Sequence, residues 1–270
     1  MSRRIAVAAL LLACSLPAAA QTTYASSGDT LRFRDVTQGK VVITTPQGEL
    51  PITVEQRSTV SIVRMRGDSA RAWYDSLFVA ATSAAGDQRP ATDSALKQPF
   101  RLGFGSRGQI KLVQAPKFPV SLEGITDLPH QFDDFFLRLP AKPLVVGLAW
   151  SDTTVRSDST ADKYSRRATT ADYRVERDTV AGGTPALIVS MKQRIVINEE
   201  GPVPNQAGMR ATSQLQGTDD GYFVFAPKPG RLLSRRRTGK LEGDTALHAA
   251  AGEMTMKQAI SYTATLDALR

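Results

Sequence analysis

Apolar and polar residues alternate with a period of two along most of the chain beyond residue 21. In residues 51–65, isoleucine or valine occupies positions 52, 54, 60 and 62, and polar residues occupy most of the odd-numbered positions between them. The same pattern recurs in residues 187–197 and 253–266. One apolar and one polar face per strand is typical of a half-buried antiparallel sheet, whereas a parallel sheet would need continuous apolar strands.

Helix signals are few. Residues 129–139 place Phe132, Phe135 and Phe136 on one helical face, and residues 92–98 form a weaker candidate. Glycine-containing turns separate many of the strand-like runs. The turns that the sequence predicts are at residues 37–40, 46–49, 105–108, 181–183 and 218–221. The pattern therefore predicts a mainly β, antiparallel fold.

The first twenty residues have the form of an export signal. Arg3 and Arg4 precede an apolar run at residues 5–13 that is too short to span a bilayer, and three alanines then precede Gln21. We expect cleavage after Ala20. The predicted division is then a signal peptide at 1–20 and a single antiparallel β domain at 21–270, exported to the periplasm or the extracellular space.

Cys14 is the only cysteine of the chain, so the mature domain has no disulfide and no cysteine-based metal site. Its surroundings resemble a lipoprotein box, and cleavage before Cys14 with lipid anchoring is the alternative to cleavage after Ala20. No further apolar run is long enough for a membrane-spanning helix, and on that ground we expect no transmembrane segment in the mature chain.

The chain is basic. Its formal net charge is +8, and loss of the two signal-peptide arginines leaves +6. For an exported protein, this excess favours contact with an anionic envelope surface and disfavours nucleic acid as a partner. The densest positive run is either a charged edge strand that resists aggregation or a contact patch for anionic groups. Its members are Arg231, Arg235, Arg236, Arg237 and Lys240.

Two short motifs suggest chemistry but lack the residues that the chemistry needs. Residues 66–69 spell Arg-Gly-Asp-Ser, which contains both an adhesion sequence and the Gly-Asp-Ser of some esterases. A serine nucleophile needs a histidine base and oxyanion donors, and His130 and His248 do not follow the esterase spacing. A metal site at His130, Asp133 and Asp134 would lack further ligands. We therefore expect a plain turn, no metal, no cofactor and no enzymatic activity.

The stretch FFLRLPAKPLVVGLAW resembles a junction found in a group of uncharacterised exported bacterial proteins, and GTDDGYFVFAPKPGRLLSRR resembles their later strands. The resemblance covers about residues 135–266. Such proteins look like relatives of the periplasmic lipoprotein-carrier (LolA-type) fold, whose strongly curved sheet holds acyl chains in an apolar concavity. The resemblance implies a curved antiparallel sheet or half-open barrel with one or two short capping helices.

The leading functional hypothesis is an exported, non-enzymatic protein that binds an apolar or amphiphilic envelope molecule such as a lipid or acyl chain. Six residues on strand-like segments are expected to line the binding surface. They are Trp73, Phe100, Leu102, Trp150, Phe223 and Phe225. The alternative is a structural or interaction module of the cell envelope whose core is filled and holds no small ligand. An apolar cavity large enough for an acyl chain would separate the two.

The signal-peptide prediction is tested by the intact mass of the exported protein. Expression in a Gram-negative host should yield a chain that begins at Gln21, because the alanines before it fit signal peptidase better than the segment before Cys14 fits a lipoprotein box. A diacylated or triacylated product that begins at Cys14 would show instead that the lipoprotein reading is correct.

Overall fold

The computed structural model describes residues 21–25, 28–65, 67–118, 122, 125–203, 206, 208–250 and 252–269, so the predicted signal peptide and Cys14 lie outside the described residues. The described chain forms one twelve-stranded antiparallel sheet. In chain order its strands are β1 (Thr30–Thr45), β2 (Gly48–Arg64), β3 (Ser69–Ser83), β4 (Gly86–Gln88), β5 (Phe100–Phe104), β6 (Ile110–Gln114), β7 (Ala149–Ser159), β8 (Tyr164–Ala181), β9 (Thr184–Pro202), β10 (Arg210–Ala226), β11 (Arg231–Ala249) and β12 (Gly252–Leu269).

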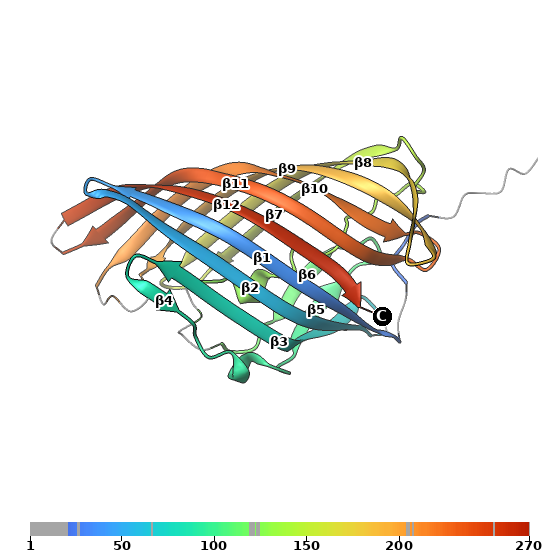
Figure 1. Ribbon diagram of the computed structural model, residues 1–270, viewed down its shortest axis with the longest axis horizontal. Coiled ribbons are helices and arrows are strands. Elements are labelled where there is room, and N and C mark those ends of the chain that lie inside the picture. Colours follow the sequence, from blue (N-terminus) through green and yellow to red (C-terminus); the bar gives the residue numbers. More distant parts are fainter. Residues whose placement is uncertain are drawn as a thin grey trace, which may run out of the picture.

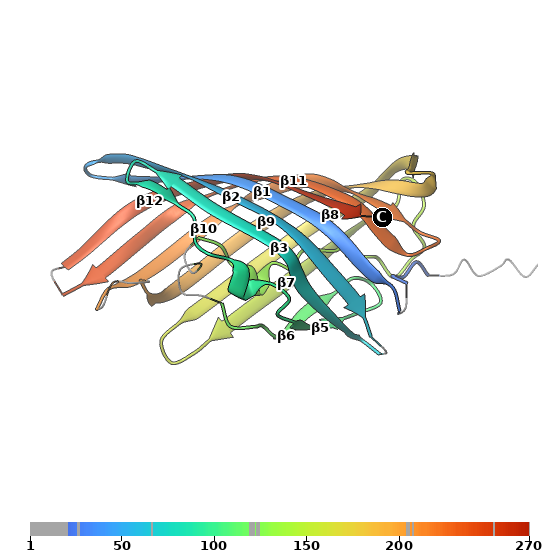
Figure 2. The same ribbon diagram turned by 60° about the horizontal axis from the view of Figure 1, so that its bottom comes forward.

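The strands form an open path rather than a closed ring. Their order is β6-β5-β3-β2-β1-β12-β11-β10-β9-β8-β7, and β4 pairs with the outer edge of β3. The first and last long strands are neighbours, since β1 and β12 run antiparallel from Arg32 opposite Leu269 to Thr44 opposite Lys257. Figures 1 and 2 show the sheet strongly curved, with β1, β11 and β12 in front in Figure 1 and β5, β6 and β7 behind them.

The two faces of the sheet differ as the alternation predicts. Phe33 on β1 and Phe223 on β10 lie on the face that the sheet curves around, which we call the concave face, and both are buried. Their chain neighbours Arg34 and Tyr222 lie on the opposite, convex face and are exposed. The mainly β, curved antiparallel fold is therefore confirmed, with charged and polar residues on most of the convex face.

Helix content is smaller than the sequence predicts. The segment expected to be helical at residues 129–139 contains only the 3-10 turn η3 (Leu128–His130), followed by irregular turns. The weaker candidate at 92–98 contains the 3-10 turn η1 (Asp93–Ala95). The phenylalanines after η3 are buried against several different strands, which a single helical face would not allow. Within the described part of the chain, no helix is long and apolar enough to cross a membrane.

Two predicted turns lie inside long strands. Residues 37–40 continue β1 and residues 218–221 continue β10. At Gly221 a Cβ atom would stand 2.1 Å from the carbonyl oxygen of Arg236 on β11, so the neighbouring backbone leaves no room for a side chain. Glycine inside a strand commonly marks such a close approach or a bend. Gly221 therefore allows the close approach of β10 and β11, and neither segment reverses the chain.

Candidate functional site: the filled concave face

The concave face is covered by the chain itself. The connection between β6 and β7 passes over it, and we call residues 127–144 the plug segment. Its leucine and phenylalanine side chains are almost completely inaccessible, with exposed fractions between 0% and 9%. These side chains are Leu128, Phe132, Phe135, Phe136, Leu137, Leu139 and Leu144. The hydrophobic core of the protein therefore lies between the sheet and a segment that has almost no regular structure.

Aromatic rings join the plug segment to β5 and β1. The ring centroid of Phe132 lies 4.9 Å from that of Phe100 on β5. Phe135 lies 5.3 Å from Phe33 on β1, again in an edge-to-face arrangement. Such pairs add about 0.5–1.5 kcal/mol each beyond the area they bury. These ring contacts fix the plug segment against the concave face of the sheet.

The residues just after the predicted cleavage site complete this core. Tyr24 is 4% exposed, and its hydroxyl donates a hydrogen bond of 2.9 Å to the carbonyl oxygen of Leu137 in the plug segment. The ring of Tyr24 also packs edge-to-face on Phe136, at 5.3 Å between centroids. Arg64 on β2 donates to the carbonyl oxygen of Tyr24 at 3.0 Å. The segment that follows the predicted cleavage site is therefore part of the packed structure.

Gln131 connects the plug segment to three strands by its amide group. The amide nitrogen donates to Asp35 Oδ2 on β1 at 3.0 Å, and the amide oxygen accepts from Gln56 Nε2 on β2 at 3.0 Å. The hydroxyl of Tyr74 on β3 also donates to this oxygen. Because burial outweighs the nearby arginines, the pKa of Asp35 is raised above its ordinary value. The side chain of Gln131 thereby satisfies polar groups that the core would otherwise leave unpaired.

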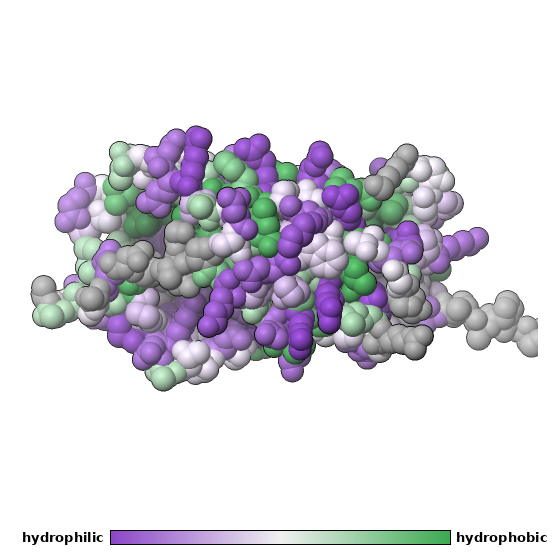
Figure 3. Space-filling model, turned by 90° about the horizontal axis from the view of Figure 1, so that it is seen from below, coloured by the Kyte–Doolittle hydropathy of each residue, from purple (hydrophilic) through white to green (hydrophobic). Residues whose placement is uncertain are grey.

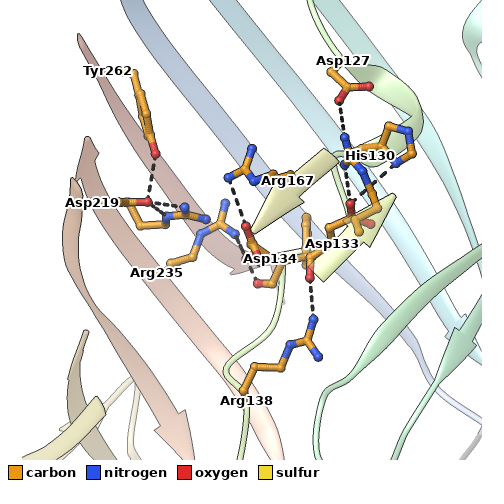
Figure 4. Close-up of polar contacts among 12 residues, drawn as sticks. Asp127, His130, Asp133, Asp134, Arg138, Arg167, Asp219, Arg235 and Tyr262 are labelled. Carbon is orange, nitrogen blue, oxygen red and sulfur yellow. Dashed lines mark hydrogen bonds and ion pairs between the residues drawn. The ribbon is translucent and has the colours of Figure 1, made fainter. Parts of the chain in front are cut away.

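Two arginines from the sheet hold Asp134 at the centre of the plug segment. Arg235 on β11 is 5% exposed, and its Nη1 donates to the backbone carbonyl of Asp134 at 2.6 Å. Arg167 on β8 donates to the carboxylate of Asp134 at 3.3 Å (Figure 4). Burial alone would raise the pKa of Asp134, but Arg167 and Arg237 outweigh it and hold that pKa below its ordinary value.

A second charged cluster lies beside the first on the concave face. Arg237 donates from Nε to Asp219 Oδ2 at 2.6 Å. The hydroxyl of Tyr262 donates to the same oxygen at 2.9 Å (Figure 4). Asp219 is fully inaccessible to solvent. Although burial opposes the charge of Arg237, Asp219 outweighs this effect and raises its pKa. Burial likewise raises the pKa of Tyr262 to about 12, so the phenol stays a hydrogen-bond donor.

Gly239 leaves room for the ring of Tyr262. These two residues are directly opposite on β11 and β12, and a Cβ atom at Gly239 would stand 2.4 Å from Cζ of the ring. A larger residue would push the hydroxyl away from Asp219. Glycine at position 239 is thus required by the polar cluster rather than by a turn.

The plug segment is also tied to β7, the strand at one edge of the open sheet. Arg156 on β7 donates to Asp133 Oδ2 at 2.6 Å, and its guanidinium lies 3.7 Å from Asp127. The two nitrogens of the His130 ring each lie 3.6 Å from a carboxylate, that of Asp133 or that of Asp158. These contacts join the connection between β6 and β7 to the strand that follows it.

The six predicted ligand-binding residues do not share an open surface. Trp73 belongs to the convex face, where its indole nitrogen donates to Asp75 Oδ1 at 3.1 Å. Trp150 is half-buried, stacked on Tyr173 at 5.2 Å, and donates to the carbonyl oxygen of Arg138. The other four are at most 2% exposed in the core. They are Phe100, Leu102, Phe223 and Phe225.

Two pockets of the described residues lie away from these six side chains. A cavity of about 30 Å³ beside Tyr24 and Arg64 has room for about one water molecule. An open depression of about 860 Å³ at the same end is lined largely by turn residues, among them Gly67 and Lys228. None of the six predicted residues lines either space. Figure 3 shows polar and apolar residues interspersed on the face seen from below, with no single apolar area.

The basic run of β11 is divided between the two faces. Arg235 and Arg237 are 5% and 9% exposed on the concave face, so neither can touch an external surface. Arg236 lies on the convex face and is paired with both carboxylate oxygens of Asp267, at 2.8 and 2.9 Å. Arg231 pairs with Asp29, and Lys240 is exposed. The predicted anionic-surface patch of five cations is corrected accordingly: the alternation of the strand separates its members.

The residues considered for catalysis are not assembled into a site. Ser69 begins β3 opposite Gly103 of β5, on the tight connection after β2. His130 belongs to the plug segment, and His248 lies near the far end of β11, 3.4 Å from Glu253. Within the described ranges, no group of three or more His, Cys, Asp or Glu residues is arranged to hold a metal ion.

Comparison with known proteins gives distant structural likenesses alone. No family model and no curated protein matches this chain. Neisserial surface protein A is similar over 89% of this chain and 99% of its own, at 7% identity and a TM-score of 0.24. A loop-deletion mutant of OmpT, an outer membrane protein of Vibrio cholerae, is similar over 90% and 100%, at 6% identity and a TM-score of 0.17. Neither match is a lipoprotein carrier, and the resemblance to that fold is not supported.

One expectation about the membrane needs correction. The absence of a transmembrane segment was inferred from the lack of long apolar runs, a test that detects helices only. Bilayers are also crossed by strands of alternating pattern, which this test does not detect. The prediction of no transmembrane segment is therefore wrong as it was stated.

Removal of the buried Asp219 carboxylate should destabilise the protein strongly. In Asp219→Asn the guanidinium of Arg237 stays buried without its counter-ion, and we expect a loss of about 3–5 kcal/mol in the free energy of unfolding, measured by urea denaturation. The neighbouring residue Asp220 is exposed on the convex face. Asp220→Asn is the matched control and should change stability by less than about 0.5 kcal/mol. Equal losses in both variants would contradict the role of the buried pair.

The carboxylates of Asp134 and Asp35 should affect the free energy of unfolding with opposite dependence on pH. The lowered pKa of Asp134 contributes stability that is complete above the unfolded-state value of about 3.9 and is lost as the pH falls toward the native value. The difference in unfolding free energy between wild type and Asp134→Asn should therefore shrink on acidification. The raised pKa of Asp35 has the opposite sign, so wild type should gain relative to Asp35→Asn as the pH falls. Parallel pH profiles for the two variants would refute this assignment.

Proposed function

We propose that this protein is an exported, non-enzymatic structural or interaction module of the cell envelope, whose concave face is filled by its own plug segment and holds no small ligand. The observation that carries the proposal is the burial of Phe132, Phe135 and Phe136 between the plug segment and the sheet. The alternating strands make an apolar concave face that must be covered by protein or by ligand. Here protein covers it.

An acyl chain could reach the buried phenylalanines only by displacing the plug segment. Each methylene group that entered would gain about 0.8 kcal/mol, but the departing segment would give up the burial of its own aromatic rings. It would also break the ion pair between Arg167 and the carboxylate of Asp134, and the hydrogen bond from Arg235 to the backbone carbonyl of Asp134. Uncompensated buried charges are costly, so the ion pairs oppose exchange of the plug segment for a ligand. The filled-core hypothesis is for this reason favoured over the carrier hypothesis.

The non-enzymatic part of the proposal rests on the positions of the candidate catalytic groups. The ring of His130 is in contact with Asp133 and Asp158, and that of His248 is in contact with Thr212 and Glu253. The two rings belong to different elements from Ser69. A nucleophile needs its base within hydrogen-bond reach. The envelope address rests on the export signal that the sequence predicts.

Protein purified without detergent at any stage tests whether an apolar molecule is bound. Native mass spectrometry of the protein beginning at Gln21 should give the mass of the polypeptide alone, and a fluorescent fatty acyl probe should show no saturable binding. The alternative makes a distinct prediction. Saturable binding at one probe per chain, abolished by Trp150→Asp while the circular dichroism spectrum is unchanged, would establish the carrier hypothesis in its place.

A further inference from the structure

Eight residues form one continuous row across the convex face. Backbone register places them directly opposite one another on eight neighbouring strands, from β2 at one end to β7 at the other. We call this set the basic row, because it contains three cations and five hydroxyl residues and no acid. In spatial order the row is Thr53, Lys40, Ser261, Lys240, Thr218, Arg194, Thr170 and Thr153.

The three cations of the basic row are evenly spaced and free. Lys40 is on β1, Lys240 on β11 and Arg194 on β9, so one strand separates each cation from the next. Neighbouring strands lie about 4.8 Å apart, so the cations are spaced about 10 Å apart along the row. All three side chains are exposed, and none forms an ion pair within 4 Å with any residue that the structure describes. The hydroxyl residues Ser261 and Thr218 occupy the strands between them.

One row beside the basic row on the convex face contains mostly acids. This row lies two residues along each strand and includes Glu55, Asp220 and Asp172, with Lys192 as its single cation. A surface whose only task was solubility would need no such separation, because interspersed charges of both signs serve that purpose. The basic row therefore presents a line of positive charge bordered by negative charge. It is a linear feature, not a diffuse patch.

We propose that the basic row binds a linear anionic polysaccharide laid across the strands of the convex face. Its cations, about 10 Å apart, match a chain in which charged sugars alternate with uncharged ones. The serine and threonine hydroxyls between the cations can donate to and accept from sugar hydroxyls. Nucleic acid fits less well, because duplex DNA carries a charge every 1.7 Å or so and single strands bind on aromatic platforms, which the row lacks. The inference goes beyond the proposed function and does not depend on how the concave face is filled.

The test uses hyaluronan, which has one carboxylate per disaccharide, with neutral dextran as the uncharged comparison. The full exported chain should bind hyaluronan at low ionic strength and not dextran, by isothermal titration calorimetry. In the triple variant Lys40→Gln, Lys240→Gln, Arg194→Gln, affinity should fall at least about ten-fold, since three contacts are lost together. Thermal unfolding verifies that this variant remains folded.

A second triple variant removes the same charge from other positions on the same face. Lys192, Lys257 and Arg174 are exposed and belong to three other rows. Their simultaneous replacement by Gln should weaken binding by less than about three-fold, because only the general attraction changes. Equal losses in the two triple variants, no binding of hyaluronan by the wild type, or equal affinity for a short DNA duplex would each overturn the proposal. Binding of an acyl probe would contradict the proposed function and leave this result unaffected.

Discussion

The structure depends on one constraint, the need to cover the apolar side of a curved, open antiparallel sheet. Closure into a ring would remove the free edges but would still leave an interior to be filled. This chain leaves the path open between β6 and β7 and sends the connection between these two strands across the concave face. The plug segment thereby supplies the second layer that a half-buried sheet needs, and its phenylalanines complete the core.

The charged residues of the concave face follow from that arrangement. A segment with little regular structure brings unpaired backbone carbonyls into the core, among them those of Asp134 and Phe135. Arg235 satisfies both, and it is itself close to Asp35 at 3.8 Å. Buried charges seldom add net stability compared with apolar packing, but they allow only one placement of their partners. Their contribution here is to fix where the plug segment lies, because an apolar interior alone would tolerate many positions.

The convex face obeys a different constraint, since solvent covers it and packing does not determine its residues. The arrangement of charged residues on this face can therefore reflect either a function or only the need for solubility. The register of the strands brings Lys40, Arg194 and Lys240 into one row. Along the chain, Lys240 lies 46 residues after Arg194 and 200 residues after Lys40. The concave and convex faces are thus independent in their chemistry, although every strand contributes to both.

The sequence by itself determined the strand character of this protein, because the two-residue period is a local property that each segment displays alone. The same period, applied to β11, accounts for Arg235 and Arg237 on one face and Arg236 on the other. The sequence could not distinguish a turn glycine from a glycine at a close approach of strands, as at Gly221, since both conformations favour the same residue. The tertiary structure alone decided that the phenylalanines of residues 132–136 fill the concavity and that Asp219 meets Arg237. Those contacts join segments distant in the chain, and their energies depend on burial that no local pattern records.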